Sequence, residues 1–192
     1  MSYDKILFGT SNIHKLKEAQ KVFENTGIKI EHYPVELVEL QETSLEKIAV
    51  YSLEKLQIND PNIFVEDTGL FIESLSGFPG PFASHAFKTL GNMGILKLMD
   101  GIKKRDAYFE SCVAFRDFDN NIVSFTARCN GNISNTINGE KWGFDPIFIP
   151  KNKDNPKNLT FSQLGDEFKS KISHRALALE KLKSYIENKN TT

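Results

Sequence analysis

The 192-residue sequence predicts an α/β fold with a mixed β-sheet. Residues 5–8 form a short apolar run that a helical pattern follows, so the chain begins as strand, loop and helix. Residues 63–65 form a second apolar run, which is typical of a buried strand. Residues 107–116 and 122–129 have the pattern of two strands in an antiparallel hairpin. Because the hairpin is antiparallel, we expect the sheet to be mixed.

The first helix follows the strand at 5–8, since Leu16, Ala19 and Phe23 are apolar at helical spacing. Asn12 is a good N-cap residue for this helix. The loop from Thr10 to Asn12 then presents the N–H groups of the helix start, where an anion is favoured.

A second helix is expected from about residue 43 to 56, because Thr43 and Glu46 have the spacing of a capping box. Its apolar face consists of Leu45, Ile48, Ala49, Ser52, Leu53 and Leu56. Residues 59–62 end it. The strand at 63–65 follows and delivers Glu66 and Asp67 at its carboxyl end, where open α/β sheets bind ligands.

The remaining elements are a turn, two helices and a polar loop. Residues 77–80 form the turn, 94–99 a short helix and 151–158 the loop. A last amphipathic helix runs from His174 to about Asn188 with Ser173 as its cap. We find no internal repeat or linker, so residues 1–192 are expected to form a single domain.

Composition and charge exclude several classes of protein. Lys and Arg number 24 against 25 Asp and Glu, so the chain lacks the basic field that nucleic acids require, and an anionic substrate needs a local cation cluster. The N-terminus has no apolar signal core, and no stretch approaches about 18 apolar residues. We therefore expect a cytoplasmic protein without a membrane segment.

Cys112 and Cys129 flank the turn of the hairpin. If Asn120 and Asn121 form a two-residue loop, the two cysteines lie opposite each other on the paired strands. In a cytosolic chain we expect two reduced, half-buried thiols.

Asp67 is the strongest candidate for a metal ligand. A carboxylate beside Glu66 at the end of a buried strand is well placed to hold Mg²⁺. The alternative is a capped turn without function. Glu39 offers a second oxygen ligand, although a lone glutamate is more often a solvated surface charge.

Lys15 lies three residues after Asn12, so its ammonium and the loop N–H groups can converge on a phosphate tail. The alternative is an exposed helix lysine. Neither the Walker motif nor the Gly-x-Gly-x-x-Gly motif occurs in the chain, which argues against P-loop and Rossmann nucleotide sites.

The loop from Trp142 to Asp145 combines two aromatic residues with a carboxylate, which suits the stacking of a base. The aromatic residues fit a hydrophobic core equally well. His174 and Arg175 offer donors at a helix start, although a structural cap explains Ser173 and His174 as well. Ser173 and His174 do not suggest a hydrolase triad, because they are adjacent on a helix and the chain has no nucleophile elbow.

In this order, the segments Thr10-Ser11-Asn12-Ile13-His14-Lys15, Glu66-Asp67-Thr68-Gly69, Gly143-Phe144-Asp145-Pro146 and Ser173-His174-Arg175 resemble the inosine triphosphate pyrophosphatase family. The resemblance extends from Ile6 to about Tyr185. It implies a long twisted mixed β-sheet flanked by helices, in two lobes with the active site in the cleft between them. It also implies a homodimer.

The resemblance assigns roles to individual residues. It implies that Glu39 and Asp67 hold Mg²⁺, with Mn²⁺ as a substitute, that Asp67 activates water, and that Lys15 acts with it in catalysis. The implied substrate-binding residues are Thr10, Ser11, Asn12, Ile13, His14, Lys15, Thr68, Trp142, Gly143, Phe144, Asp145, Lys169, His174 and Arg175. Two positions depart from the family pattern: Tyr51 replaces a lysine of the second helix, and Ser84 and His85 follow the Pro-Gly turn where relatives place a lysine or arginine.

The function expected from the resemblance is Mg²⁺-dependent hydrolysis of aberrant purine nucleoside triphosphates. ITP, dITP and XTP would be converted to the monophosphate and pyrophosphate. One alternative is a sensor that binds these nucleotides without hydrolysis, against which Glu39, Asp67 and Lys15 argue. Another is a phosphatase acting on phosphorylated metabolites.

Overall fold

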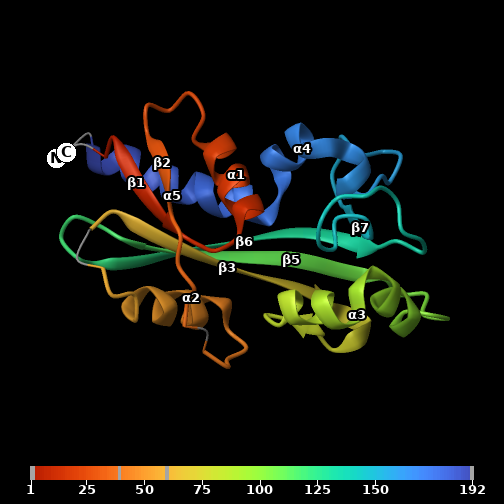
Figure 1. The fold of residues 1–192 in the computed structure, drawn as a ribbon. Coiled ribbons are helices and arrows are strands. Elements are labelled where there is room, and N and C mark those ends of the chain that lie inside the picture. The colour runs from red at the N-terminus through yellow and green to blue at the C-terminus, as the bar shows by residue number, and fades with distance from the viewer. Residues whose placement is uncertain (1–2, 39, 59–60, 191–192) are drawn as a thin grey trace. The chain divides into compact units, whose positions relative to one another are not determined.

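The computed structural model describes residues 3–38, 40–58 and 61–190. Its elements follow one another along the chain as β1 (Lys5–Gly9), α1 (Ile13–Val22), β2 (Lys29–Tyr33), α2 (Leu45–Glu54), β3 (Ile63–Ile72), the short 3₁₀ helix η1 (Glu73–Leu75), β4 (Pro79–Gly80), α3 (Ala83–Leu98), β5 (Asp106–Arg116), β6 (Ile122–Ile133), β7 (Phe148–Pro150), α4 (Phe161–Ile172) and α5 (His174–Asn190) (Figure 1). None of the helices in the described ranges is long and apolar enough to cross a membrane.

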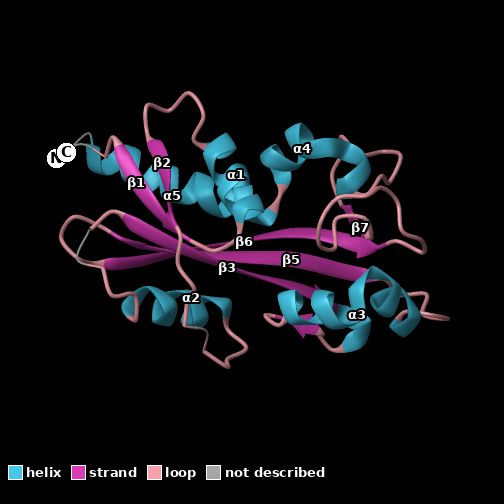
Figure 2. Ribbon diagram, in the orientation of Figure 1, coloured by secondary structure: helices cyan, strands magenta, loops and turns pink. Residues whose placement is uncertain are grey.

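The strands form one mixed sheet, as predicted. Its order is β2-β1-β3-β5-β6-β7, and β4 pairs with β3 beside this path. β1 is parallel to both β2 and β3, whereas β4 is antiparallel to β3 and β7 is antiparallel to β6. Helices flank the sheet (Figure 2), so the predicted α/β fold class is confirmed.

The chain divides into two compact units. The first unit comprises Met1–Asp67, Ser111–Ala127 and His174–Thr192, and the second comprises Thr68–Glu110 and Arg128–Ser173. β3, β5 and β6 contribute residues to both.

The core of the first unit lies between β1, β3, α1 and α5. Phe8 and Phe64 are partners in the parallel register, and their rings stack with centroids 4.3 Å apart. Leu16 and Ala19 of α1 join the same buried cluster as Leu182 of α5. Burying a leucine or phenylalanine side chain completely stabilises a fold by about 1.5–3 kcal/mol. This cluster therefore fixes α1 and α5 on the sheet.

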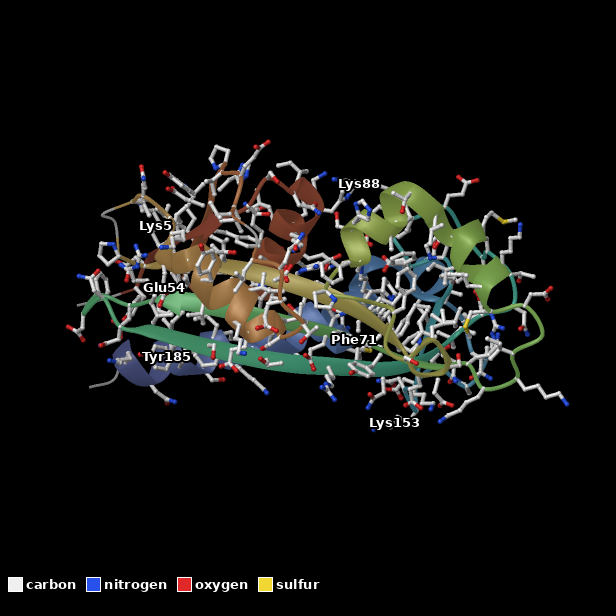
Figure 3. The ribbon with its side chains drawn as sticks, turned by 90° about the horizontal axis from the view of Figure 1, so that it is seen from below. Lys5, Glu54, Phe71, Lys88, Lys153 and Tyr185 are labelled. Carbon is white, nitrogen blue, oxygen red and sulfur yellow. The ribbon has the colours of Figure 1, made fainter. Side chains whose placement is uncertain are left out.

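Asp117 anchors the hairpin of the first unit to α5. Its carboxylate accepts the backbone N–H groups of Asp119 and Asn121 and the hydroxyl of Tyr185, which is labelled in Figure 3. These contacts satisfy a buried carboxylate. They therefore hold the turn between β5 and β6 against the last helix.

The core of the second unit contains a cluster of three aromatic rings. The ring centroid of Phe109 in β5 lies 4.6 Å from that of Phe148 in β7. The ring centroid of Phe148 lies 5.3 Å from that of Phe161 in α4. A capping box of Thr160 and Gln163 starts α4 beside this cluster.

Two helix starts test the predicted caps. Asn12 caps α1 as predicted, because its side chain accepts hydrogen bonds from the N–H groups of His14 and Lys15. The capping box predicted for Thr43 is wrong. Ser44 is the N-cap of α2 and accepts from the N–H of Lys47 at 3.4 Å.

β3 continues to Ile72, so the prediction that the strand ends at Val65 is wrong. Gly69 lets the strand continue beside β4, since a Cβ there would lie 2.8 Å from the carbonyl oxygen of Gly80. β1, however, ends at Gly9, opposite Val65 in the parallel register. Glu66 and Asp67 therefore lie just beyond the carboxyl end of β1 rather than of β3.

Six segments of regular structure were not predicted: β2, η1, β4, β7, α4 and the first half of α3. Both missed α-helices contain a glycine with positive φ, Gly91 at +61° in α3 and Gly165 at +81° in α4. Such a residue interrupts the helical periodicity that a sequence pattern detects. The helix predicted at 94–99 is the second half of α3.

The predicted pairing of the two cysteines is wrong. The N–H of Asp117 donates to the carbonyl of Asn121 at 3.0 Å, and Asn120 has a φ of +60°, so three residues form the loop. Counting five residues outward from this pair places Cys112 opposite Thr126, not opposite Cys129. Both thiols are free and buried.

Candidate functional site

The loop between β1 and α1 is ordered by its own side chains. The hydroxyl of Thr10 accepts the N–H of Asn12 at 3.0 Å, and Oδ1 of Asn12 accepts the N–H groups of His14 and Lys15 at 2.9 and 3.3 Å. Ser11, Ile13 and His14 are exposed around this turn. The loop thus presents the start of a helix, which favours an anion, at the surface of the first unit.

β2 holds the same loop from the other side. The N–H of Thr10 donates to the carbonyl of Tyr33 at 3.2 Å, and Nε2 of His32 lies 2.8 Å from the carbonyl oxygen of Thr10. His32 was not among the predicted site residues. Contacts to both the N–H and the carbonyl oxygen of Thr10 therefore hold the loop in place before any ligand binds.

Lys15 is not an exposed helix lysine. Its Nζ lies 2.9 Å from Oε2 of Glu66 and 3.0 Å from the carbonyl oxygen of the same residue, and its side chain is 17% exposed. The first turn of α1 is therefore tied to β3 at the point where β1 ends.

Glu66 is the centre of a buried group of charges, which we call the Glu66 cluster: Lys15, Glu18, Glu66, Ser111 and Arg175. The Glu66 carboxylate is fully buried, its Oε1 accepts the hydroxyl of Ser111, and Nε of Arg175 lies 3.3 Å from the same oxygen. Arg175 is 2% exposed and also contacts Glu18 through Nη1. The cluster joins α1, β3, β5 and α5 within the first unit.

The carboxylates keep Arg175 charged in this buried position. Burial by itself lowers the pKa of a guanidinium, but Glu66 and Glu18 outweigh it and raise the pKa of Arg175 above its ordinary value. His174 is likewise buried, at the first position of α5. Both predicted base-reading residues of the first unit are therefore buried.

Asp67 lies on the opposite face of β3 from Glu66, since successive residues of a strand point to opposite faces. Figure 1 shows α2 on the other side of β3 from α1 and α5. Asp67 is half-buried. On the α2 side, the buried hydroxyl of Ser52 donates to the carbonyl of Val38 at 2.9 Å and so ties the segment 34–38 to α2. Glu39, the predicted second ligand, lies outside the described residues.

The second unit contains its own group of predicted site residues. Nζ of Lys169 lies 2.7 Å from Oδ2 of Asp145, and these side chains are 5% and 6% exposed. The ammonium also lies 5.7 Å from the centroids of the Trp142 and Phe161 rings. The lysine is thus buried among a carboxylate and two aromatic faces, which compensate its charge.

The two aromatic residues of the predicted stacking loop have different environments. Phe144 packs in the core of the second unit, edge-on to Phe87 with centroids 5.3 Å apart. Trp142 is half-buried. Gly143 has a φ of +67°, and its carbonyl accepts Nδ2 of Asn92 at 3.1 Å. For Phe144 the structure therefore supports the alternative of a core residue, whereas Trp142 is only half-buried.

The predicted residues thus fall into two groups. Thr10 to Lys15, Asp67, His174 and Arg175 belong to the first unit; Thr68, Trp142 to Asp145 and Lys169 belong to the second. Sequence reasoning missed Glu18 and Ser111 and gave Glu66 no role of its own. Glu18 stands three residues after Lys15 on α1, a spacing that places both on one helix face. No local pattern marks Ser111, which reaches Glu66 from another strand.

The comparisons with known proteins cover most of the chain. The sequence model of the Ham1 family matches residues 6–185. A dITP/XTP pyrophosphatase of Methanopyrus kandleri is 43% identical over 187 residues, which are 96% of this chain and 97% of the relative. The dITP/XTP pyrophosphatase of Thermococcus kodakarensis is 40% identical over 185 residues, 95% of this chain and 97% of the relative.

Solved structures show the same fold. The Ham1 protein of Staphylococcus aureus superposes with a TM-score of 0.79 at 22% identity, covering 96% of this chain and 99% of that one. A nucleoside-triphosphatase, also named dITP/XTP pyrophosphatase, from Mycobacterium abscessus gives a TM-score of 0.68 at 27% identity, with 93% and 97% covered. The predicted resemblance is confirmed, and the chain belongs to the Ham1 family.

Proposed function

We propose that this protein is a Mg²⁺-dependent nucleoside triphosphate pyrophosphohydrolase that converts ITP, dITP and XTP to the monophosphate and pyrophosphate. The observation that carries the proposal is the placement of Lys15 and Asp67 at the end of β1, beside an ordered loop that opens a helix. The names of the relatives support the substrate class.

The β1–α1 loop and Lys15 bind the triphosphate. The N-terminus of α1 favours negative charge, and the Lys15 ammonium adds a point charge to it. Because Thr10 and Asn12 are already held by hydrogen bonds, little conformational entropy is lost when the phosphates bind.

Asp67 and Glu39 are the proposed ligands of Mg²⁺. The donor set fits this ion: Mg²⁺ takes one or two protein carboxylates and keeps several waters, so three clustered ligands are not required. Within the described ranges, no group of three or more His, Cys, Asp and Glu residues forms such a cluster. When bound, Mg²⁺ would neutralise the charge of the phosphates. Asp67 also accepts the proton of the water that attacks near the α-phosphorus.

Base selection rests on donors to the 6-oxo group of the purine. His174 and Arg175 offer donors, and adenine presents an amino group there that leaves them unpaired. In the second unit, Trp142 provides a ring for stacking, while Asp145 and Lys169 supply polar contacts.

One incubation tests the proposal against its alternatives. The protein is mixed with ITP and Mg²⁺, and IMP, IDP, pyrophosphate and phosphate are resolved by chromatography. A pyrophosphohydrolase gives IMP and pyrophosphate in equal amounts. IDP and phosphate indicate a phosphatase, and tight ITP binding without products indicates a sensor; either result refutes the proposal.

The resemblance also implies a homodimer, and we include it in the proposal. Sedimentation equilibrium over a range of protein concentrations tests it, and a species with the mass of one chain throughout contradicts it.

A further inference from the structure

Glu66 has no step in the proposed mechanism, yet its carboxylate is fully buried, which costs folding free energy. A fully buried carboxylate destabilises a fold unless cations and hydrogen bonds compensate it. Here Lys15, Arg175 and Ser111 provide that compensation. Compensation explains how the charge is tolerated in the first unit, but a neutral side chain would need none.

The contacts of the Glu66 cluster converge on the first turns of α1. Lys15 and Glu18 are three residues apart and share a helix face. Lys15 contacts Glu66 directly, while Glu18 contacts Arg175, which in turn contacts Glu66. The helix that opens the phosphate loop is thus held at two points by one buried carboxylate and one buried guanidinium.

The contacts also determine the direction in which Lys15 can bind a further group. An ammonium has three N–H donors. Within the part of the chain that the structure describes, the ammonium donates to the carbonyl oxygen of Glu66 at 3.0 Å, and it also forms an ion pair with Oε2 of the same residue at 2.9 Å. Because the carbonyl oxygen and the carboxylate of Glu66 both hold the ammonium, the flexible side chain is ordered before a ligand arrives, and its remaining donors have a defined direction.

We propose that Glu66 is a positioning residue: it orients the Lys15 ammonium for a phosphate group and is not a ligand of Mg²⁺. Both of its carboxylate oxygens already contact cations or a hydroxyl donor. The inference rests on the proposed function, because the phosphate group is the tail of the nucleotide substrate.

The test uses Glu66→Asp, which keeps the charge and withdraws the carboxylate by one C–C bond, about 1.5 Å. The attraction of the whole cluster for an anion is therefore unchanged, but the contact of 2.9 Å with Lys15 is lost. Glu18→Asp is the matched control, since it shortens the other carboxylate partner of Arg175 on the same helix as Lys15.

Binding of inorganic pyrophosphate is measured by titration calorimetry, which requires no turnover. We expect Glu66→Asp to weaken pyrophosphate binding about tenfold, since one oriented charge-assisted hydrogen bond is lost, and Glu18→Asp to change it less than twofold. In a Lys15→Ala background, Glu66→Asp should have no further effect. Three results would overturn the proposal. The first is an equal loss of pyrophosphate affinity in Glu66→Asp and Glu18→Asp, and the second is a loss caused by Glu66→Asp that is just as large in the Lys15→Ala background. The third is a parent protein that does not bind pyrophosphate.

Two further measurements separate the possible failures. The Mg²⁺ concentration for half-maximal ITP hydrolysis should be the same in Glu66→Asp and the parent, and an increase would identify Glu66 as a metal ligand instead. If the parent hydrolyses no ITP, the proposed function fails, while the pyrophosphate titrations still decide the role of Glu66. Should Glu66→Asp not fold, Ser111→Ala removes the hydroxyl that holds Oε1 and should weaken pyrophosphate binding about threefold; unchanged binding would contradict the proposal.

Discussion

Replacing Asp145 by asparagine should strongly destabilise the protein, because it leaves the ammonium of Lys169 buried without its carboxylate. The two side chains are 5% and 6% exposed, and their charged atoms are 2.7 Å apart. Breaking such a pair on one side costs about 3–5 kcal/mol. The rings of Trp142 and Phe161, each 5.7 Å from Nζ, offset about 1 kcal/mol of that cost.

We therefore expect Asp145→Asn to lower the free energy of unfolding by about 2–4 kcal/mol. For a chain of this length, 1 kcal/mol corresponds to roughly 2–4 °C in Tm, so the melting temperature should fall by roughly 5–15 °C. Calorimetry and urea unfolding measure the two quantities independently.

A matched control for this prediction lies on α4, the helix that carries Lys169. Glu167 and Lys171 of α4 also form an ion pair, at 3.7 Å, but their side chains are 82% and 70% exposed. Since solvent screens such a pair, Glu167→Gln should change Tm by less than about 2 °C. The double variant Asp145→Asn, Lys169→Met removes both buried charges and should recover at least about half of the loss. An Asp145→Asn variant as stable as Glu167→Gln would refute the reasoning.

Other expectations concern catalysis, selectivity and the thiols. Asp67→Asn should abolish ITP turnover without changing the circular dichroism spectrum, and turnover within a few-fold of the parent would remove Asp67 from the mechanism. Glu39→Gln should raise the Mg²⁺ concentration that ITP hydrolysis requires, and a Mg²⁺ titration that superposes on that of the parent would remove Glu39 as a ligand. Arg175→Ala should reduce the preference for ITP over ATP, measured as kcat/KM, by roughly ten- to a hundredfold, and it should also lower Tm because buried ion pairs are lost; equal kcat/KM for ATP and ITP in the parent would contradict this. Burial raises the pKa of Cys112 to about 11 and of Cys129 to about 12. The two neutral thiols therefore contribute their full share to the free energy of unfolding below the unfolded pKa of about 8.5, and this share is lost as the pH rises toward the folded values. Ellman's reagent at pH 8 should therefore modify both thiols only on unfolding, and rapid reaction of the native protein would show that they are accessible.

Local patterns were sufficient where neighbouring residues determine the structure. Asn12 caps α1 through N–H groups two and three residues away, so its role is visible in a short segment. The apolar run at 5–8 and the last helix were predicted for the same reason. The order of the motifs along the chain also sufficed to identify the family, because it does not depend on packing.

Short-range rules failed where one residue changes the backbone. The loop with Asn120 at positive φ shifted the hairpin pairing and separated Cys112 from Cys129. Gly91 and Gly165 interrupted two helices that no continuous periodicity marks. The choice between a two-residue and a three-residue turn depends on contacts of the whole hairpin, which the turn sequence alone does not contain.

The tertiary structure alone decided which charges are buried. From the sequence, Glu66 is an acidic residue beside Asp67, and charged residues are expected to be solvated. Its partners Ser111 and Arg175 lie 45 and 109 residues away along the chain, and only folding brings them to one carboxylate. The same holds for Lys169 and Asp145. A pattern of residue types reports periodicity and local hydrogen bonds, whereas the balance between desolvation and pairing of a charge is set by atoms that are remote in sequence.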